Sequence, residues 1–491
     1  MDEKTEKRSS MDGSIEKIDI EHASIPENKN FIATPAEKKL VKKINRAFAP
    51  LLCLILFIQF CDKTTLSMAA ILPQFYKDTH ISQDQYSWVS SIFYLGYLSM
   101  QLFNNYMLQK YPIAKFVGIV LVIWGATLLS MAWATSFSQL AALRFLLGFF
   151  EAVTYPAMFL LIATLYRRSE QVIWFGVMFM SNGLAGILGS VIGVGVLQMP
   201  TVGNISPWKW SQIIFGSFTC LLGFFYFVFL PDTPTSRWFR LTDEEKKIVE
   251  ERTRDNAVVP TASINYNQIR EALREPRFYC YMLISLFGNF QNGALTNFST
   301  IIIKNLGFTG VNTILLNIPS GAMSLLLIAL FTFISKKKNE IIYVAVAATT
   351  VSLVGLVILT AIPNGGGRLA GLYLAWSNTS AYLLMQASIT SNVSGYTKKI
   401  FYTSVNLIFY TFGNFIGPLL LVEKDSPRYL TGMGVYVACN IMNILLFLFI
   451  RYSYVKQNKK RQADNELAEI ALPGELEDLT DVENKHFVYR P

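Results

Sequence analysis

Twelve long apolar blocks constrain what this 491-residue chain can fold into. A helix needs about 20 predominantly apolar residues to cross the hydrocarbon core of a bilayer. The chain is 52% hydrophobic and only 16% charged, so the blocks dominate it and predict an all-α membrane protein with twelve transmembrane helices. We expect the spans at about residues 47–73, 86–108, 113–134, 139–163, 171–198 and 208–230, and again at 277–302, 311–334, 340–362, 368–392, 400–422 and 431–452.

A polar segment divides the twelve blocks into six and six. Two halves related in this way are typical of secondary transporters, which bind their substrate between the halves near the middle of the membrane. Within the polar segment, Thr242 and Glu245 have the spacing of a capping box and predict the start of a short helix. The predicted organisation is a disordered cytoplasmic tail (1–46), a first six-helix bundle (47–230), a central cytoplasmic loop with a short helix (231–276), a second six-helix bundle (277–453) and a cytoplasmic C-terminal tail (454–491).

The basic residues form short clusters between the apolar blocks, as at Arg167 and Arg168 and at Lys336 to Lys338. Clusters of this kind mark the cytoplasmic flanks of membrane helices. A protein that binds nucleic acid would instead place its positive charge along one folded face, so the net charge of +9 does not predict that partner. The same bias predicts that both termini are cytoplasmic.

Several kinds of chemistry are disfavoured by the positions of reactive residues. The five cysteines lie inside apolar blocks without metal-ligand spacing, and the three histidines lie outside the blocks. The chain also lacks the glycine-rich phosphate loop of ATP-driven proteins. We therefore expect no metal and no cofactor. Since no nucleophile, base and metal set is visible, we expect that the protein is not an enzyme.

Four ionisable residues interrupt the apolar blocks at depth: Asp62 and Lys63 in the first, and Arg144 and Glu151 in the fourth. Placing a charge at mid-membrane costs roughly 3 kcal/mol on insertion scales, and such residues are usually functional. Asp62 and Lys63 point about 100° apart on a helix, so each needs a partner on another helix. Arg144 and Glu151 lie two turns apart on one face. A cluster of two acids and two bases across both helices is sterically plausible.

Charge balance predicts what such a cluster could do. With all four groups ionised the sum is zero, and an added anionic substrate leaves a net negative charge in a site of low dielectric constant. Protonation of Asp62 or Glu151 restores neutrality, so that anion and proton favour each other's binding. Lys63 or Arg144 would then hold the anion. The alternative is an ion-pair network that only fixes helix packing, and Arg144 is the member that fits this alternative best.

Uncharged polar residues gather in the seventh and tenth blocks. The stretches "FGNFQNGALTNFS" and "WSNTSAYLLMQ" contain amides and hydroxyls that could bind a polar substrate or hold helices together. The candidate substrate contacts are Asn289, Asn292 and Asn297 in the seventh block and Asn378, Tyr382 and Gln386 in the tenth. In the fifth block, the glycine series "SNGLAGILGSVIGVGV" predicts close helix contact.

Four stretches carry a resemblance to a known family: "CDKTTLSMAAI", "LRFLLGFFEAVTYPAMFLLIATLYRRSEQ", "LPDTP" with "LTDEE", and "LTNFSTIIIKNLGF". The span from about 47 to 453 resembles the major facilitator superfamily and, within it, the anion:cation symporters of the fungal allantoate permease group. The resemblance implies alternating access by two rocking halves, driven by a proton gradient. It also implies protonation at Asp62 and Glu151, contact of Lys63 with the substrate anion, and an ion pair of Arg144 with the acids. Many relatives have arginine at the position of Lys63, and lysine offers a point charge instead of a planar fork.

These observations together predict a proton-coupled symporter that imports a small organic anion. A vitamin, a ureide or a sulfur compound fits the resemblance. The predicted partners are that anion, a proton and the lipid bilayer, and we expect a monomer in the plasma membrane. Two alternatives stay open: an exporter of drugs or metabolites with the same fold, and a nutrient sensor that signals through its tails without transport.

Overall fold

Helices build both halves of the computed structural model, which describes residues 35–166, 168–199, 205–231, 233, 235–256, 265–362, 366–465, 479–484 and 487–491. The first half contains α1 (Pro35–Ala69), α2 (Pro73–Thr79), α3 (Gln83–Lys110), α4 (Ile113–Ser130), α5 (Phe137–Glu151), α6 (Thr154–Leu165), α7 (Arg168–Leu197) and α8 (Pro207–Phe229). The second contains α11 (Pro276–Asn305), α12 (Val311–Leu315), α13 (Ile318–Lys338), α14 (Ile342–Ala361), α15 (Gly367–Ala375), α16 (Asn378–Asn392), α17 (Tyr396–Leu419) and α18 (Leu430–Asn465).

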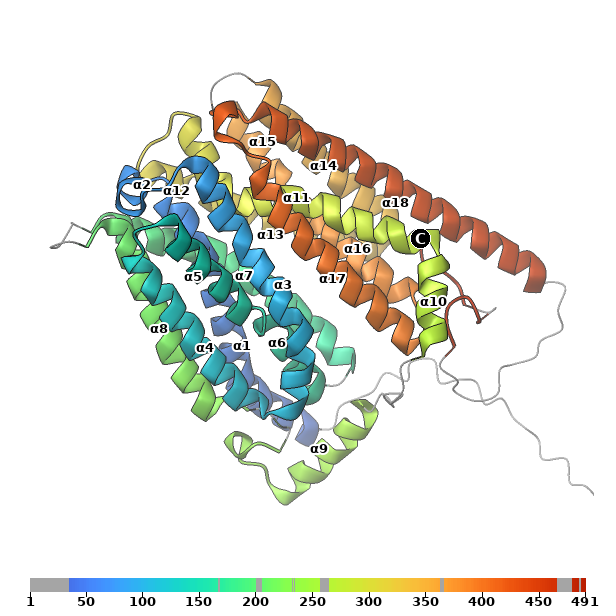
Figure 1. The fold of residues 1–491 in the computed structure, drawn as a ribbon. Helices are drawn as coiled ribbons and strands as arrows, with labels where there is room; N and C mark the ends of the chain where they lie inside the picture. The colour runs from blue at the N-terminus through green and yellow to red at the C-terminus, as the bar shows by residue number, and fades with distance from the viewer. Residues whose placement is uncertain are drawn as a thin grey trace, which may run out of the picture.

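The two groups of helices stand side by side, the first drawn in blue to green and the second in yellow to red (Figure 1). Each of the twelve predicted blocks coincides with one helix or with two consecutive helices, and the predicted fold class is confirmed. Within the described residues, seven helices are long and apolar enough to cross a membrane by length and composition alone. Helices such as α11 are long enough but not apolar enough to meet this criterion, because they carry many polar side chains. Those side chains are buried inside the protein.

Two helices extend into the predicted tails, and part of the C-terminal tail packs against the second half. Helix α1 begins at Pro35, inside the predicted N-terminal tail, because Leu40, Ile44 and Phe48 repeat every four residues and bury one face of its first turns. Helix α18 continues to Asn465, well into the predicted C-terminal tail. Farther on, residues 479–484 and 487–491 pack against the second half.

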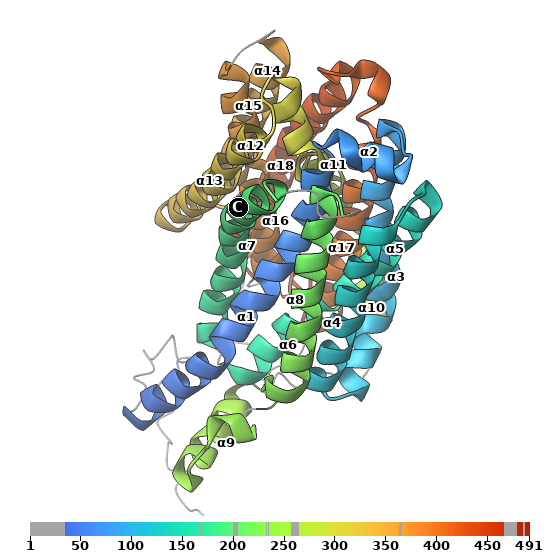
Figure 2. The ribbon, with the colours of Figure 1, turned by 90° about the vertical axis from the view of Figure 1, so that its left-hand side faces the viewer.

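The central segment forms two helices instead of the single predicted one: α9 (Asp243–Asn256) and α10 (Tyr266–Arg274). The predicted capping box is confirmed, since the Thr242 N–H donates to Glu245 at 2.9 Å and the Glu245 N–H donates to the Thr242 hydroxyl at 3.3 Å. Lys43 of α1 pairs with Glu245 at 2.7 Å, which anchors α9 to the first half. Figure 2 shows α9 at the same end of the molecule as the start of α1.

The fourth helix of each half is broken. In the first half α5 ends at Glu151 and α6 begins at Thr154, because Pro156 has no N–H to donate and its ring crowds the preceding turn. In the second half α15 ends at Ala375 and α16 begins at Asn378. Non-helical backbone at this depth is tolerated only where it is buried in protein or lines a cavity. Both breaks therefore point to the interface between the halves.

The halves are joined by hydrogen bonds at the end of the molecule that carries α2, which we call the α2 end. The Thr300 hydroxyl donates to the carbonyl of Ser67 at 2.7 Å, and the Tyr86 hydroxyl donates to the carbonyl of Asn297 at 2.8 Å. The Glu423 N–H donates to Asp84 at 2.8 Å. Within the described residues, the hydrogen bonds between the halves all lie at this end. The opposite end, near α9 and α10, is the α9/α10 end.

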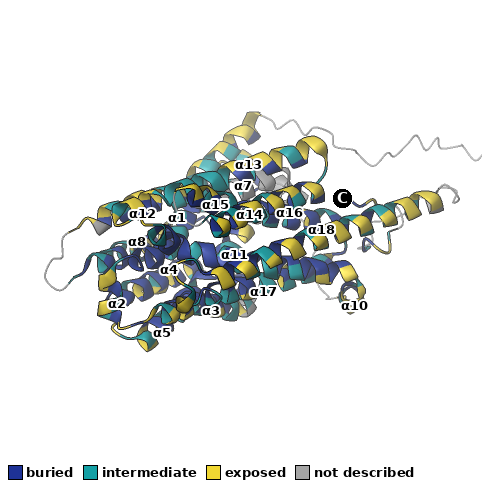
Figure 3. Cartoon of the chain, turned by 90° about the horizontal axis from the view of Figure 1, so that it is seen from above, coloured by how far each residue is buried: buried dark blue, intermediate teal, exposed yellow. Residues whose placement is uncertain are grey.

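Close helix contacts complete the interface. The glycine series of the block at 171–198 predicts close helix contact, and this is confirmed at Gly183 of α7. A Cβ added there would lie 2.2 Å from the Leu325 side chain of α13. Viewed from above, buried residues line the inner faces of the helices and exposed residues face outwards (Figure 3). This is the pattern of a protein whose outer surface meets lipid and whose polar residues are kept inside.

Candidate binding cavity between the halves

A cavity of about 220 Å³ lies between the two halves. Helices α1, α3, α6 and α7 line it from the first half, and α11, α13, α16 and α17 line it from the second. Its wall is mostly aromatic, amide and hydroxyl in character, and within the described residues Lys63 is the one charged side chain that lines it. Prominent wall residues are Tyr94, Tyr155, Asn292, Trp376, Thr379 and Tyr410.

Lys63 reaches across from α1 to the break in the fourth helix. Its ammonium lies 2.9 Å from a carboxylate oxygen of Glu151, and Glu151 is fully buried whereas the Lys63 side chain is 21% exposed. Gln59, one turn before Lys63, donates to the same Glu151 oxygen at 3.0 Å. Because residues four apart share a helix face, α1 presents both donors to Glu151 together. The other Glu151 oxygen accepts no hydrogen bond from the described residues.

Asp62 and Arg144 lie behind this pair and away from the cavity. Both are buried, and Asp62 interacts electrostatically with Glu151, Arg144 and Lys63. Neither Asp62 oxygen accepts a hydrogen bond within the described residues, and the Thr219 hydroxyl on nearby α8 donates instead to the carbonyl of Phe215 at 2.8 Å. The Arg144 guanidinium lies 6.0 Å from the centre of the Phe93 ring. The four ionisable residues thus come together, but only Lys63 touches the cavity.

The second half contributes a chain of amides. Asn292 donates to Asn414 at 2.9 Å, and Asn414 donates to Asn289 at 3.1 Å. Asn378, at the start of α16, donates to the carbonyl of Gly288 at 2.7 Å. These bonds fix the amide groups of Asn289, Asn292 and Asn378 at the cavity wall. Each amide retains a donor or acceptor for a ligand, because an amide side chain has two donor hydrogens and two acceptor lone pairs.

Five of the predicted substrate contacts line the cavity: Lys63, Asn289, Asn292, Asn378 and Tyr382. The other three do not line it in this structure. Arg144 packs behind Glu151. Asn297 donates to the carbonyl of Gly293 at the α2 end, while its neighbour Thr296 faces the cavity. Gln386 donates to the hydroxyl of Tyr382 at 3.0 Å and so helps to fix the position of this wall residue without lining the cavity itself.

Sequence reasoning missed the aromatic part of the wall. Tyr94, Tyr155 and Tyr410 come from three different helices, and Tyr410 packs on Tyr382 with ring centres 5.4 Å apart. The one available signal was Tyr155, which follows Glu151 by four residues and would share its face on an unbroken helix. Aromatic residues are so frequent in this chain, at 14%, that the cavity members do not stand out.

The lysine, amides, hydroxyls and aromatic rings of this wall can bind a small polar molecule. Two helical halves around a buried cavity, with a broken fourth helix in each half, are the arrangement of a membrane transporter. The Major Facilitator Superfamily profile matches residues 52–420. The chain therefore belongs to the Major Facilitator Superfamily, whose members are multi-pass membrane transporters and not enzymes.

Individual relatives agree with this assignment. The chain is 35% identical to an uncharacterized transporter of Schizosaccharomyces pombe, over 92% of this chain and 89% of that one. It is 32% identical to the allantoate permease of Saccharomyces cerevisiae, over 96% of this chain and 90% of that one. Among solved structures, a bacterial homolog of the human lysosomal transporter Spinster, inward-facing and unoccupied, is similar with a TM-score of 0.63 and 15% identity, covering 86% of this chain and 96% of that one.

Proposed function

We propose that this protein is a proton-coupled symporter that imports a small organic anion. The observation that carries the proposal is the Lys63–Glu151 ion pair at the cavity wall, with its 2.9 Å separation. Among the described residues, the cavity wall offers a bound molecule one cation, Lys63, and that cation is already paired with a buried acid. An anion that enters must therefore compete with Glu151 for Lys63.

The competition couples the anion to a proton. When an anion takes Lys63, Glu151 loses its ion pair and, among the described residues, keeps only the Gln59 hydrogen bond. An uncompensated buried charge is costly, and a proton on Glu151 removes that cost. Anion and proton therefore bind best together, which is the reciprocal coupling that symport requires. Asp62, buried and without a hydrogen bond from the described residues, is the second candidate proton carrier.

The uncharged wall supports recognition of the rest of the substrate. Asn289, Asn292 and Asn378 offer amide donors and acceptors opposite Lys63, and Tyr94, Tyr155 and Tyr410 offer flat apolar faces. A small carboxylate with further hydrogen-bonding groups fits this wall. The allantoate permease among the relatives is named for such an anion. We therefore take allantoate as the first compound to test, followed by vitamin and sulfur-containing carboxylates.

The proposed orientation places both termini, α9 and α10 in the cytoplasm, and the proposed location is the plasma membrane, where the protein acts as a monomer. Basic residues at the cytoplasmic flanks support this orientation. With it, the hydrogen bonds at the α2 end close the outer side of the cavity, and the structure corresponds to an inward-facing state.

The decisive experiment is uptake into proteoliposomes that contain the purified full-length protein, with an inward proton gradient and radiolabelled allantoate. Glu151→Gln should abolish accumulation above the equilibrium ratio, because the amide cannot take up a proton. It should preserve exchange of internal for external anion, because Lys63 is still present. Asp243→Asn, at an exposed carboxylate, is the matched control and should behave as the wild type.

Each alternative predicts a different outcome. An exporter would move the anion out of the vesicles against its gradient when protons flow the other way. A sensor without transport would show no flux in either direction with any compound. Proton-driven accumulation by Glu151→Gln at the wild-type rate would remove Glu151 from the mechanism.

A further inference from the structure

The C-terminal residues of the chain fold back onto the α9/α10 end of the second half, far from the cavity. Figure 1 shows this segment beside α10. The Ile341 N–H, just before α14, donates to the carbonyl of Pro491 at 3.0 Å. Asn392, at the end of α16, receives the Arg490 N–H at 2.7 Å and donates to the Arg490 carbonyl at 2.9 Å. The segment therefore ties together helices that are far apart in sequence.

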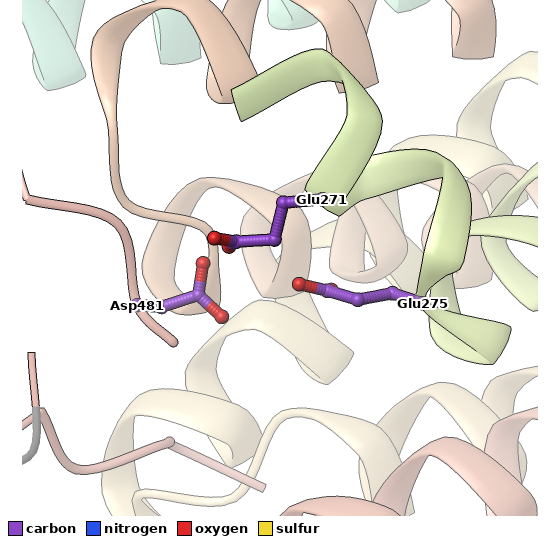
Figure 4. A group of neighbouring side chains, drawn as sticks. All are labelled: Glu271, Glu275 and Asp481. Atoms are coloured by element: carbon purple, nitrogen blue, oxygen red, sulfur yellow. The ribbon is translucent and has the colours of Figure 1, made fainter. Parts of the chain in front are cut away.

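Its charged centre is Lys398, which is fully buried near the start of α17. The Lys398 ammonium lies 2.8 Å from Glu271 of α10 and 2.7 Å from Asp481 of the tail, and it also contacts Glu275. Figure 4 shows these three carboxylates pointing toward one another. Their oxygens lie within 4.8 Å of one another, a spacing that could suit a metal ion, but the Lys398 ammonium already contacts all three. Burial lowers the pKa of Lys398, but Asp481 and Glu275 raise it more, so the net pKa lies above its ordinary value.

Aromatic and arginine side chains close the site around Tyr489. The Tyr489 hydroxyl donates to Asp481 at 2.8 Å, and the guanidinium groups of Arg277 and Arg461 lie 4.7 and 4.8 Å from the centre of its ring. Arg461 also donates to the backbone carbonyl of Asp481 at 2.6 Å. Three cations and three acids are therefore gathered here: Lys398, Arg277 and Arg461 with Glu271, Glu275 and Asp481. The docked tail balances the charges within this group.

Thr480 lies beside this group of charges, and its hydroxyl is bonded to one of the three acids, Glu271. Its side chain is fully buried, and its hydroxyl donates to Glu271 at 3.1 Å while it accepts the Glu483 N–H at 3.1 Å. Acidic residues surround Thr480 in the sequence, in the stretch "ELEDLTDVE". A phosphoryl group on Thr480 would be larger than the buried hydroxyl that it replaces, and the side chain to which that hydroxyl donates is a carboxylate, Glu271.

We propose that residues 479–484 and 487–491 form a detachable strap on the second half, and that Thr480 is a phosphorylation site whose modification releases the strap. A protein kinase that accepts acidic substrates would transfer the γ-phosphoryl group of a nucleoside triphosphate to the Thr480 oxygen. The hydroxyl proton is released and the nucleoside diphosphate leaves. The inference goes beyond the proposed transport activity, and it requires only that the tail is cytoplasmic.

Electrostatics explains why a phosphoryl group would release the strap. A phosphothreonine carries about −1.5 to −2 charge, and next to acidic residues it disrupts by repulsion and desolvation. It would lie beside Glu271 and Asp481 and would remove the Thr480 hydrogen bond to Glu271. Because Thr480 is buried in the docked state, the kinase would act when the strap opens transiently, and the product would be held open.

Release of the strap would also loosen α10. This helix contacts α17 through Gln268, which accepts the Lys398 N–H at 3.1 Å, and through Glu271. Helix α11, which lines the cavity, begins directly after Glu275. The strap therefore braces the ends of two helices, α11 and α17, that reach the cavity wall.

Hydrogen–deuterium exchange on the purified full-length protein tests the proposal. In the wild type the amides of Glu483, Tyr489 and Arg490 should be protected, since their N–H groups are all bonded. Thr480→Glu, which mimics the added charge, should speed exchange in 479–491 and 266–274 by roughly a hundredfold, because a charge buried without a partner is strongly destabilising. Peptides from α9 should not change. Val482→Glu adds the same charge at an exposed side chain and should leave the protection intact.

A second measurement uses the kinase itself. Incubation of the wild-type protein with an acidophilic protein kinase and ATP should place phosphate on Thr480, and the modified protein should show the exchange pattern of Thr480→Glu. Rapid exchange of 479–491 in the unmodified wild type would overturn the strap. Full protection in Thr480→Glu, or phosphorylated protein that stays protected, would overturn the role of Thr480.

Discussion

At the scale of single residues, Lys63 holds the central position because it is the only wall residue with a full charge among those that the structure describes. Its flexible stem and its 21% exposure allow it to face either Glu151 or a bound anion. Gln59 differs in role, since it bonds Glu151 from a fully buried position and does not line the cavity. One face of α1 therefore carries two donors to Glu151: Lys63, which can exchange Glu151 for a bound anion, and Gln59, which remains bonded to Glu151.

Lys63→Ala should weaken binding of anionic substrates by about 10- to 100-fold, since hydrogen bonds to charged groups contribute about 1.5–3 kcal/mol. Isothermal titration of the purified variant with the transported anion measures this directly. Lys63→Arg keeps the charge and should retain most of the affinity. If Lys63→Ala binds the anion as tightly as the wild type, Lys63 does not contact the substrate.

Much of the charged cluster could be predicted from the sequence, because an ionisable residue inside an apolar block is costly to insert and is usually kept for function. The uncharged contacts could be predicted only in part. Thr296 and Asn297 are adjacent and both polar, yet only Thr296 lines the cavity. Which of two neighbours faces a cavity depends on how its helix is rotated against the others, and packing between distant segments decides that rotation.

At the scale of helices, the site depends on how closely α5 approaches α3. Gly148 lies one turn before Glu151, and a Cβ added there would lie 1.9 Å from the backbone carbonyl oxygen of Phe93. A backbone atom cannot move aside as a flexible side chain can. The absence of a side chain at Gly148 therefore lets α5 pack directly on the backbone of α3 one turn before Glu151.

Gly148→Ala should destabilise the protein by about 1–3 kcal/mol or more, because the added methyl group forces α5 away from α3. The same displacement should separate Glu151 from Lys63 and reduce proton-driven uptake. Thermal unfolding in detergent and the proteoliposome assay measure the two effects. Gly195→Ala, where a Cβ would meet nothing within 4 Å, is the matched control. Equal melting temperatures for the two variants would contradict the close contact.

The helix pattern was predicted better than its interruptions. Apolar block length predicts the presence and order of the helices, and all twelve blocks are helical. The break after Glu151 has a local signal in Pro156, but the break between α15 and α16 has no proline and depends on tertiary contacts. The docking of residues 479–484 and 487–491 was missed for the same reason, since its partners lie on α10, α16, α17 and α18.

At the scale of the whole molecule, the hydrogen bonds at the α2 end should hold the halves together during part of each transport cycle. Cysteines introduced by Ser67→Cys and Thr300→Cys, in a background without the native cysteines, should be joined by a short bifunctional thiol reagent. The joined protein should not transport, because its outer side cannot open. Each single variant treated with the same reagent is the control. Normal uptake by the cross-linked double variant would show that this end does not need to open.

The ion pair between Lys63 and Glu151 also bears on how the carrier responds to membrane voltage. The charges of Lys63 and Glu151 cancel while the two groups are paired. An empty carrier that reorients in this state therefore moves no net charge from this pair across the membrane. A carrier loaded with one monovalent anion and one proton likewise moves none. Under the proposed mechanism the cycle is therefore electroneutral, and accumulation follows the pH difference across the membrane and not the electrical potential.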